Sequence, residues 1–190
     1  GRVPAYADRP EMTAPRTDVR PFEYAEARIA FYPPGGRRSG DGSWNRMQLP
    51  LEPAESQKHL VTPVDFEVQL FASEPQIRKP ICMNWDERGR LWIAETVDYP
   101  NDLQPGGEGN DRITICEDTD RDGQADKFTV FADKLSIPTS LAFHRGGVIV
   151  HQAPHTLYLK DTDGDDVADE RRVLFSGWST GDTHAGPSNL

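Results

Sequence analysis

The chain of 190 residues carries 31 acidic and 21 basic side chains, so its formal net charge is −10. This charge excludes a nonspecific phosphate-binding surface, and nucleic acid is therefore not an expected partner. No apolar run approaches the roughly 18 residues of a membrane span, and the first residues lack the apolar core of a signal peptide, so no membrane span is expected.

Residues 1–62 are predicted to form an extended arm. This segment holds eight of the 16 prolines and the pair Gly35-Gly36, and it shows no sustained hydrophobic periodicity. A disordered linker is the alternative interpretation. Near the end of the segment, Pro53 indicates a short helix over residues 53–60, because proline is favoured in the first turn of a helix.

Residues 63–190 are predicted to form an all-β domain. Short runs of β-branched and aromatic residues alternate there with Gly, Asp and Pro, and no amphipathic helix is apparent. The candidate strands cover residues 66–72, 81–85, 90–95, 112–117, 127–131, 140–143, 148–152, 156–160 and 171–175.

An internal repeat organises these strands. Asp118-Thr-Asp and Asp161-Thr-Asp open two similar acidic loops 43 residues apart, each with a strand before and after it. Four strands in about 40 to 50 residues match one blade of a β-propeller. Because a ring needs at least about four blades, the chain is expected to hold two blades and the start of a third at residues 187–190. The strand at residues 66–72 would close the ring as the outer strand of the last blade.

The two cysteines form neither a Cys-x-x-Cys nor a Cys-x-x-Cys-His motif, so this chain has no zinc knuckle and no haem motif. Cys82 and Cys116 fall on the first and third strands of one predicted blade. With one strand between them they would lie about 9 to 10 Å apart, too far for a disulfide. Two buried free thiols are expected.

The first acidic loop has the ligand spacing of a calcium loop. Positions 1, 3, 5 and 9 hold aspartates, position 6 holds Gly123, and the carbonyl of Gln124 would be the position-7 donor. The aspartates are Asp118, Asp120, Asp122 and Asp126. Alternating carboxylates allow the chain to curl around a hard cation, and glycine permits the sharp turn.

The second loop repeats this spacing, with the carbonyl of Val167 as the matching donor. Asp166 replaces the glycine, which is tolerable because aspartate can adopt positive φ. Its other aspartates are Asp161, Asp163, Asp165 and Asp169. Two Ca²⁺ sites are therefore predicted, each fastening the hairpin between the third and fourth strands of a blade.

An EF-hand is not expected, because position 12 holds Thr129 or Arg172 instead of glutamate and the flanking segments are strands. The alternative interpretation of both loops is a pair of solvated Asx-type turns that bind nothing. Clustered carboxylates repel one another unless a cation offsets their charge, which favours the calcium interpretation.

Four segments resemble a known family. They begin at Met47 (MQLPLEPAES), Phe66 (FEVQLFASEP), Met83 (MNWDERGRLWIAETVDYP) and Gly181 (GDTHAGPSNL). Together they are similar to the N-terminal propeller of the PVC-type haem-binding Cys-x-x-Cys-His proteins, also called the membrane-bound dehydrogenase domain family, over residues 47–190. That propeller is in turn similar to the soluble quinoprotein glucose and sorbosone dehydrogenases, which are six-bladed. The resemblance implies part of a six-bladed propeller, with further blades, helical repeats or a c-type haem domain as partners.

The resemblance also implies a catalytic site. In the quinoprotein dehydrogenases a histidine in an Asp-His-x-x-Gly context acts as the general base while hydride passes to pyrroloquinoline quinone (PQQ). Asp182-Thr-His184-Ala-Gly186 is similar, with one inserted residue. His184 is therefore expected to be the base and Asp182 to orient it, while the basic residues that hold the cofactor would lie in later blades. The alternative is a loop histidine bonded to a neighbouring blade.

Three polar residues, Glu95, Gln152 and His155, lie at or after second strands of the two blades. The loops that follow these strands should face the mouth of the central channel, so the three residues are candidates to line it. The alternative is simple contact with solvent.

The sequence thus predicts a calcium-stabilised, dehydrogenase-like propeller that oxidises a sugar or alcohol with a quinone cofactor. The alternative is a non-catalytic propeller module that binds a glycan or a protein. The calcium loops and the family resemblance together suggest a periplasmic or extracellular location.

Overall fold

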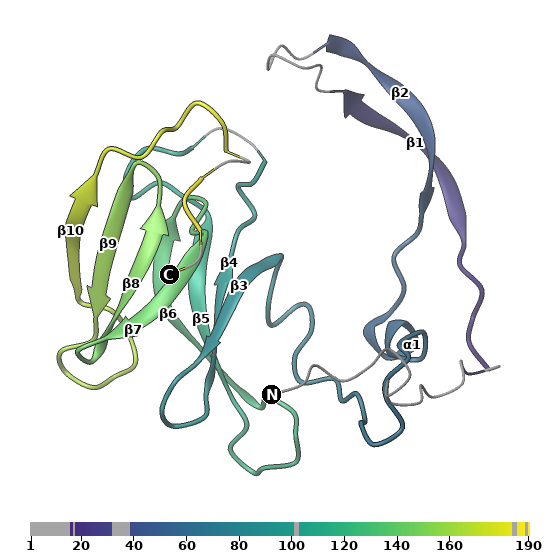
Figure 1. Ribbon diagram of the computed structural model, residues 1–190, viewed down its shortest axis with the longest axis horizontal. Coiled ribbons are helices and arrows are strands. Elements are labelled where there is room, and N and C mark those ends of the chain that lie inside the picture. The colour runs from purple at the N-terminus through teal and green to yellow at the C-terminus, as the bar shows by residue number, and fades with distance from the viewer. Residues whose placement is uncertain (1–15, 17, 32–38, 101–102, 184–185, 189) are drawn as a thin grey trace, which may run out of the picture. The chain divides into compact units, whose positions relative to one another are not determined.

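The computed structural model describes residues 16, 18–31, 39–100, 103–183, 186–188 and 190 (Figure 1). The chain divides into two compact units, Gly1–Leu70 and Phe71–Leu190. Among the described residues, no helix has the length and apolar character needed to cross a membrane.

The first unit contains an antiparallel hairpin and a short helix. The hairpin pairs β1 (Tyr24–Phe31) with β2 (Ser39–Gln48). It was not predicted, because charged residues interrupt both segments and Gly and Ser interrupt the second, so neither shows the regular alternation typical of a strand. The helix α1 (Pro53–Gln57) begins with proline in its first turn, as predicted. The side chain of Glu55 accepts a hydrogen bond from the Arg20 backbone N–H at 2.6 Å, which joins the helix to the segment before the hairpin.

The second unit consists of two four-stranded antiparallel sheets (Figure 1). In each sheet, strands that are neighbours in the sequence are also neighbours in space. The first sheet holds β3 (Pro80–Trp85), β4 (Leu91–Glu95), β5 (Asp111–Glu117) and β6 (Lys127–Leu135). The second sheet holds β7 (Ser140–His144), β8 (Gly147–Gln152), β9 (His155–Lys160) and β10 (Glu170–Ser176). The all-β class and these eight strands confirm the sequence prediction.

The facing sides of the two sheets share one hydrophobic core. Trp92 and Ala94 of β4 point into it, and Leu141, Val150 and the other members come from strands of both sheets. The ring of Trp92 packs edge-on against those of Phe131 and Phe143 at centroid distances of 4.5 and 5.3 Å. Side chains therefore interlock between the sheets, which fixes how the loops at their ends face one another.

The other side of the first sheet is covered by the start of the second unit. Phe71 and Ala72 pack against a cluster that includes Leu91 and Cys116, and the backbone N–H of Ala125 donates to the carbonyl of Phe71 at 2.8 Å. The predicted strand at residues 66–72 is therefore wrong, because this segment forms no strand and its end packs through side chains onto a sheet face. Likewise, residues 187, 188 and 190 form no strand.

Both thiols are free, as predicted. Cys82 lies opposite Ala94, and Ala94 lies opposite Ile113, whereas Cys116 is three residues beyond Ile113 on the same strand. Because side chains alternate along a strand, the two thiols point to opposite faces of the sheet. Burial, followed by the nearby charge of Glu95, raises the pKa of Cys116 to about 11. Cys82 is only half-buried, so the prediction of two buried thiols is correct for Cys116 alone.

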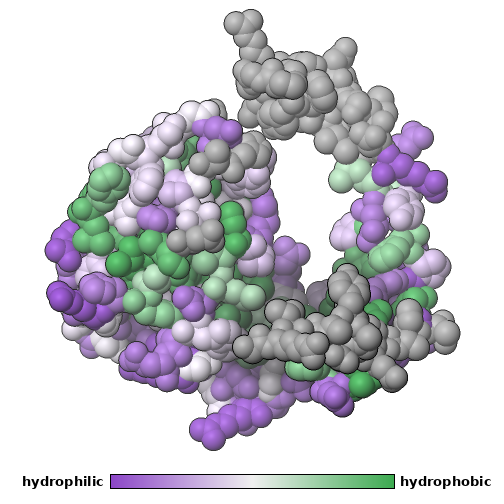
Figure 2. All heavy atoms as spheres, in the orientation of Figure 1, coloured by the Kyte–Doolittle hydropathy of each residue, from purple (hydrophilic) through white to green (hydrophobic). Residues whose placement is uncertain are grey.

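The edge strands β3 and β10 leave large apolar side chains exposed, and Figure 2 shows hydrophobic atoms gathered on the surface of this unit. Their exposed fractions lie between 44% and 70%. The residues are Ile81, Met83 and Trp85 on β3, and Val173, Leu174 and Phe175 on β10. Both are edge strands of their sheets, and β3 lies beside β7 of the second sheet.

Candidate functional site

The loop between β5 and β6 is shaped by its own aspartates. Asp118 accepts hydrogen bonds from the backbone N–H groups of Arg121 at 2.7 Å and Gly123 at 2.9 Å. Asp122 in turn accepts from the backbone N–H of Gln124 at 2.8 Å. These Asx-type bonds hold the carboxylates of the loop on its inner side.

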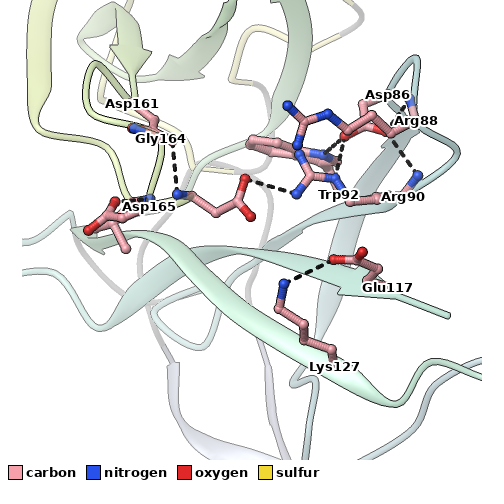
Figure 3. Close-up of polar contacts among 11 residues, drawn as sticks. Asp86, Arg88, Arg90, Trp92, Glu117, Lys127, Asp161, Gly164 and Asp165 are labelled. Carbon is pink, nitrogen blue, oxygen red and sulfur yellow. Dashed lines mark hydrogen bonds and ion pairs between the residues drawn. The ribbon is translucent and has the colours of Figure 1, made fainter. Parts of the chain in front are cut away.

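The loop between β9 and β10 has the same bonds at the same positions. Asp161 accepts from the backbone N–H groups of Gly164 at 2.7 Å and Asp166 at 2.8 Å, and Asp165 accepts from Val167 at 2.8 Å (Figure 3). Asp166 has a φ of 65°, where the first loop has Gly123 at 90°. The prediction that aspartate adopts positive φ at this position is confirmed.

The first three predicted ligands of each loop come together. Asp118, Asp120 and Asp122 form one cluster, and Asp161, Asp163 and Asp165 form the other. In each cluster one carboxylate oxygen from each aspartate lies within 4.8 Å of the others, so each group could hold a metal ion. The charge of Asp165 raises the pKa of Asp163 above its usual value. This shift reflects the repulsion that a bound cation would relieve.

The fourth predicted ligand of each loop has another partner. Asp126 accepts from the backbone N–H of Thr119 at 3.0 Å and from its hydroxyl at 2.6 Å. Asp169 binds Thr162 in the same way, at 3.1 and 2.6 Å. Asp126 and Asp169 therefore brace the base of each loop and are not members of the three-aspartate clusters.

A buried ion-pair network links the second acidic loop to the first sheet (Figure 3). The guanidinium of Arg90 donates to Asp86 and to Asp166, each at 2.8 Å. The indole N–H of Trp92 donates to the same Asp86 oxygen that accepts from Arg90 Nε, at 3.0 Å. Asp166 belongs to the second loop, so Arg90 joins two sheets across 76 residues of sequence. The sequence analysis missed this role, because spacing along the chain does not show which loops face each other.

The carboxylate of Asp86 is held in its charged form. Burial alone would raise its pKa, but the backbone N–H of Arg90, the indole of Trp92 and the Arg90 guanidinium together hold that pKa below its usual value. Asp86 also accepts from the backbone N–H of Arg88 at 2.9 Å, which closes the turn between β3 and β4. Asp86 therefore shapes the turn and also holds the Arg90 guanidinium in place.

Glu95 does not line a channel, and that prediction is wrong. Its side chain is 1% exposed and receives hydrogen bonds from the Arg112 guanidinium at 2.8 Å, the Thr114 hydroxyl and the backbone N–H of Arg78 at 2.6 Å. Because Arg112 and Thr114 lie on the neighbouring strand β5, pairing of the strands brings these groups to the carboxylate.

The other two channel candidates have local partners. The side-chain oxygen of Gln152 accepts from the backbone N–H of Ser136 at 3.0 Å. His155 Nδ1 lies 3.0 Å from the hydroxyl of Ser176 on the adjacent strand β10. Both contacts hold strand ends together.

Asp111 is a buried carboxylate that the sequence analysis did not single out. It is 1% exposed and accepts four hydrogen bonds, from the Thr96 hydroxyl at 2.9 Å and from backbone N–H groups at 2.6 to 3.0 Å. The backbone donors are Val97, Asp98 and Ile137. Since Ile137 lies in the link between β6 and β7, Asp111 ties the loop after β4 to the connection between the sheets.

A cleft of about 640 Å³ lies along β3 and β7, the first strands of the two sheets. Thr183 and Gly186 line it and flank His184, which lies outside the described residues. Asp182, the predicted partner of His184, is exposed. Among the described residues, the lining is Ile81, Cys82, Met83, Asn84, Tyr99, Thr139, Ser140, Leu141, Thr183, Gly186, Ser188 and Leu190.

Comparison with known proteins gives one family match. The model of a domain of unknown function, DUF7133, matches residues 52–190. Neither the curated proteins nor the solved structures contain a significant match to this chain. The matched segment includes α1, both four-stranded sheets and both acidic loops.

Proposed function

The chain belongs to the DUF7133 family, and we propose that it is a calcium-binding β-propeller module whose acidic loops each hold one Ca²⁺. The observation that carries this proposal is the repetition of one loop geometry in two sheets. In both loops three carboxylates converge within 4.8 Å, with the same Asx-type bonds around them. Calcium is the hard cation that prefers such oxygen ligands.

The proposal also includes the architecture of the module, a β-propeller. A blade is a four-stranded antiparallel sheet, and blades pack face to face around an axis. Both sheets have this strand order and share one core. The exposed apolar residues of β10 support a further blade on that side of the second sheet. The resemblance to the N-terminal propeller of the PVC-type haem-binding proteins supports six blades, completed by further domains or chains that include a c-type haem domain.

Calcium removal is expected to lower the melting temperature, and added calcium to restore it, because a ligand that binds only the folded state stabilises it. At a calcium concentration 100 times the dissociation constant the gain would be about 2.7 kcal/mol per site. The measurement is thermal unfolding in EDTA and in excess Ca²⁺. An unchanged melting temperature would contradict the proposal and leave two Asx-type turns.

Asp163→Asn provides a sharper test of the second loop. The raised pKa of Asp163 means that its charged form destabilises the fold at neutral pH, so the variant in EDTA should melt no lower than the parent. It should nevertheless lose the calcium response of that loop. Asp133→Asn, on an exposed strand position outside both loops, is the matched control and should keep the full response.

We also propose that the cleft along β3 and β7 receives a sugar or alcohol, which the protein oxidises. Its support is the position of Thr183 and Gly186 in the lining, on either side of the segment that holds His184. In this proposal His184 accepts the hydroxyl proton of the substrate and Asp182 orients its imidazole. A periplasmic or extracellular location accords with it, because calcium modules of modest affinity work outside the cell.

The resemblance implies PQQ as the electron acceptor, and PQQ carries carboxylates that call for cationic side chains. None of the described lining residues is cationic. These residues cannot hold PQQ by themselves, so the cationic side chains would have to come from the later blades that the resemblance implies. PQQ held there would accept the hydride of the sugar or alcohol. Absence of cationic side chains from those blades would favour the second candidate function, a non-catalytic module that binds a glycan or another protein.

Activity separates the two candidates. The protein, supplied with Ca²⁺, PQQ and a sugar, should reduce an artificial electron acceptor, and His184→Ala should reduce the rate about 10²- to 10⁴-fold if this histidine is the general base. His144→Ala, which changes an exposed histidine at the end of β7, should leave the rate unchanged. Equal rates for the His184 variant and the parent would remove His184 from the mechanism, and no rate at all would favour the binding module.

A further inference from the structure

We propose that a cavity between the first turns of the two sheets binds a small molecule that carries an oxyanion, carboxylate or phosphate, and that Arg88 and Arg145 hold this group. The cavity has a volume of about 570 Å³, which is within the range of pockets for small ligands. It shares none of its described lining residues with the cleft along β3 and β7. It is therefore a second site, separate from the one proposed for the substrate.

Three loops form this cavity. They are the turn between β3 and β4, the turn between β7 and β8, and the acidic loop between β9 and β10. The ion pairs of Arg90 with Asp86 and Asp166, each at 2.8 Å, join the first of these turns to the acidic loop (Figure 3). Because these three side chains satisfy one another, they hold the wall of the cavity in place and leave the binding of a ligand to other residues.

Arg88 and Arg145 are the basic residues that remain available. Both line the cavity and are exposed. Each directly precedes a glycine with positive φ, Gly89 at 80° and Gly146 at 74°, in the turn between the first two strands of its sheet. The two arginines thus hold corresponding positions. Within the part of the chain that the structure describes, neither guanidinium makes a hydrogen bond or an ion pair.

The lining combines these cationic groups with apolar surface. Trp92, Phe131 and Phe143 line the cavity, and Phe143 is 36% exposed. A guanidinium presents a fork of N–H donors that matches the oxygens of a carboxylate or phosphate. A molecule with one such group and an apolar group therefore matches both parts of the lining.

Two aspartates of the acidic loop also line the cavity and make binding depend on calcium. Asp161 and Asp163 would repel an oxyanion, and the Ca²⁺ proposed for their loop would offset that charge. Ca²⁺ takes about six to eight oxygen ligands. Because Asp169 is bonded to Thr162, the loop offers three carboxylates and one carbonyl, so a ligand oxygen could complete the coordination. This calcium dependence rests on the proposed function, whereas the arginine contacts do not.

Isothermal titration calorimetry with benzoate and phenyl phosphate tests the site, and benzyl alcohol is the uncharged counterpart of both. In excess Ca²⁺ at least one of the two anions should bind, and benzyl alcohol should not. The anion that binds more tightly identifies the group as carboxylate or phosphate. Absence of binding by both anions, or equal binding of benzyl alcohol, would overturn the inference.

Arginine variants separate contact with the ligand from a general effect of charge. Arg88→Gln and Arg145→Gln should each weaken binding about tenfold, as the loss of a hydrogen bond to a charged group would. Both variants should keep the melting temperature of the parent, because no described contact is lost. Arg121→Gln is the matched control, since Arg121 is exposed on the first acidic loop and does not line this cavity, and it should keep full affinity. Full affinity in both Arg88→Gln and Arg145→Gln would remove the arginines from the site.

Titration in EDTA distinguishes failure of this site from failure of the proposed function. Affinity for the anion should fall severalfold in EDTA, and equal affinity would overturn the calcium dependence. A melting temperature that rises with Ca²⁺, without binding of either anion, would keep the calcium module and reject this site. Anion binding that both arginine variants weaken, without any calcium response, would reject the calcium sites and keep this one.

Discussion

Asp111→Ala is expected to lower the free energy of unfolding by about 4 kcal/mol. The substitution leaves four donors without an acceptor. At least three of these donors belong to buried residues, namely Thr96, Asp98 and Ile137. Each unsatisfied buried group costs about 1 to 3 kcal/mol, and partial entry of water reduces the sum. Since whole domains are stable by only about 5 to 15 kcal/mol, the variant should unfold at much lower denaturant. Urea unfolding followed by tryptophan fluorescence measures the change.

Two further variants make this prediction specific. Asp111→Asn keeps one carbonyl oxygen as an acceptor, so its free energy of unfolding should fall about half as much, by roughly 2 kcal/mol. Asp133→Ala removes an exposed carboxylate that lies 3.2 Å from Arg171, and it should cost less than about 1 kcal/mol. Similar losses for Asp111→Ala and Asp133→Ala would contradict the role of the buried carboxylate.

Arg90→Met is the second substitution with a large expected effect, and it should lower the free energy of unfolding by about 3 kcal/mol at neutral pH. Removing one member of a buried ion pair leaves an uncompensated charge, which costs about 3 to 5 kcal/mol. Because Asp166 is 25% exposed, we expect a value at the lower end of that range. Lys127→Met is the matched control, because Lys127 pairs with Glu117 at 3.2 Å but is 53% exposed. It should cost less than about 1 kcal/mol.

The pH dependence of this stability loss shows whether lost charge or lost packing causes it. The pKa of Asp86 is lower in the folded protein than its unfolded value of about 3.9, so its contribution to stability is present above that value and is lost as the pH falls through the folded pKa. The difference in stability between the parent and Arg90→Met should therefore be full at neutral pH and shrink below about pH 4. A difference that stays constant down to acidic pH would indicate lost packing instead of lost charge.

The regular elements of the second unit could be predicted from the sequence for a physical reason. Each strand is a short run of β-branched and aromatic residues, and the turns between them carry their own signals. Between β7 and β8, for example, Arg145 and Gly146 both have positive φ, the geometry of a two-residue hairpin turn. The acidic loops could also be predicted from the sequence, because their shape depends on hydrogen bonds between residues two to five positions apart.

Contacts between residues far apart in the chain could not be predicted from the sequence. The pairing of Arg90 with Asp166 depends on how the sheets stack, and the surroundings of Glu95 depend on the register of β4 against β5. The segment at residues 66–72 has the composition of a strand, yet its end packs through Phe71 onto a sheet face. Local pattern therefore specified elements and loops, while tertiary packing decided which polar groups became buried anchors.

The apolar edge strands have a consequence for the protein in solution. An uncovered edge presents a row of backbone N–H and C=O groups that can pair with a strand of another molecule, and β10 adds Val173 and Phe175 at 52% and 54% exposure. Wherever this edge stays uncovered, copies can add to one another edge to edge, and the net charge of −10 opposes it. Solubility would then decline as added salt screens that repulsion, so ionic strength becomes a variable to control during purification.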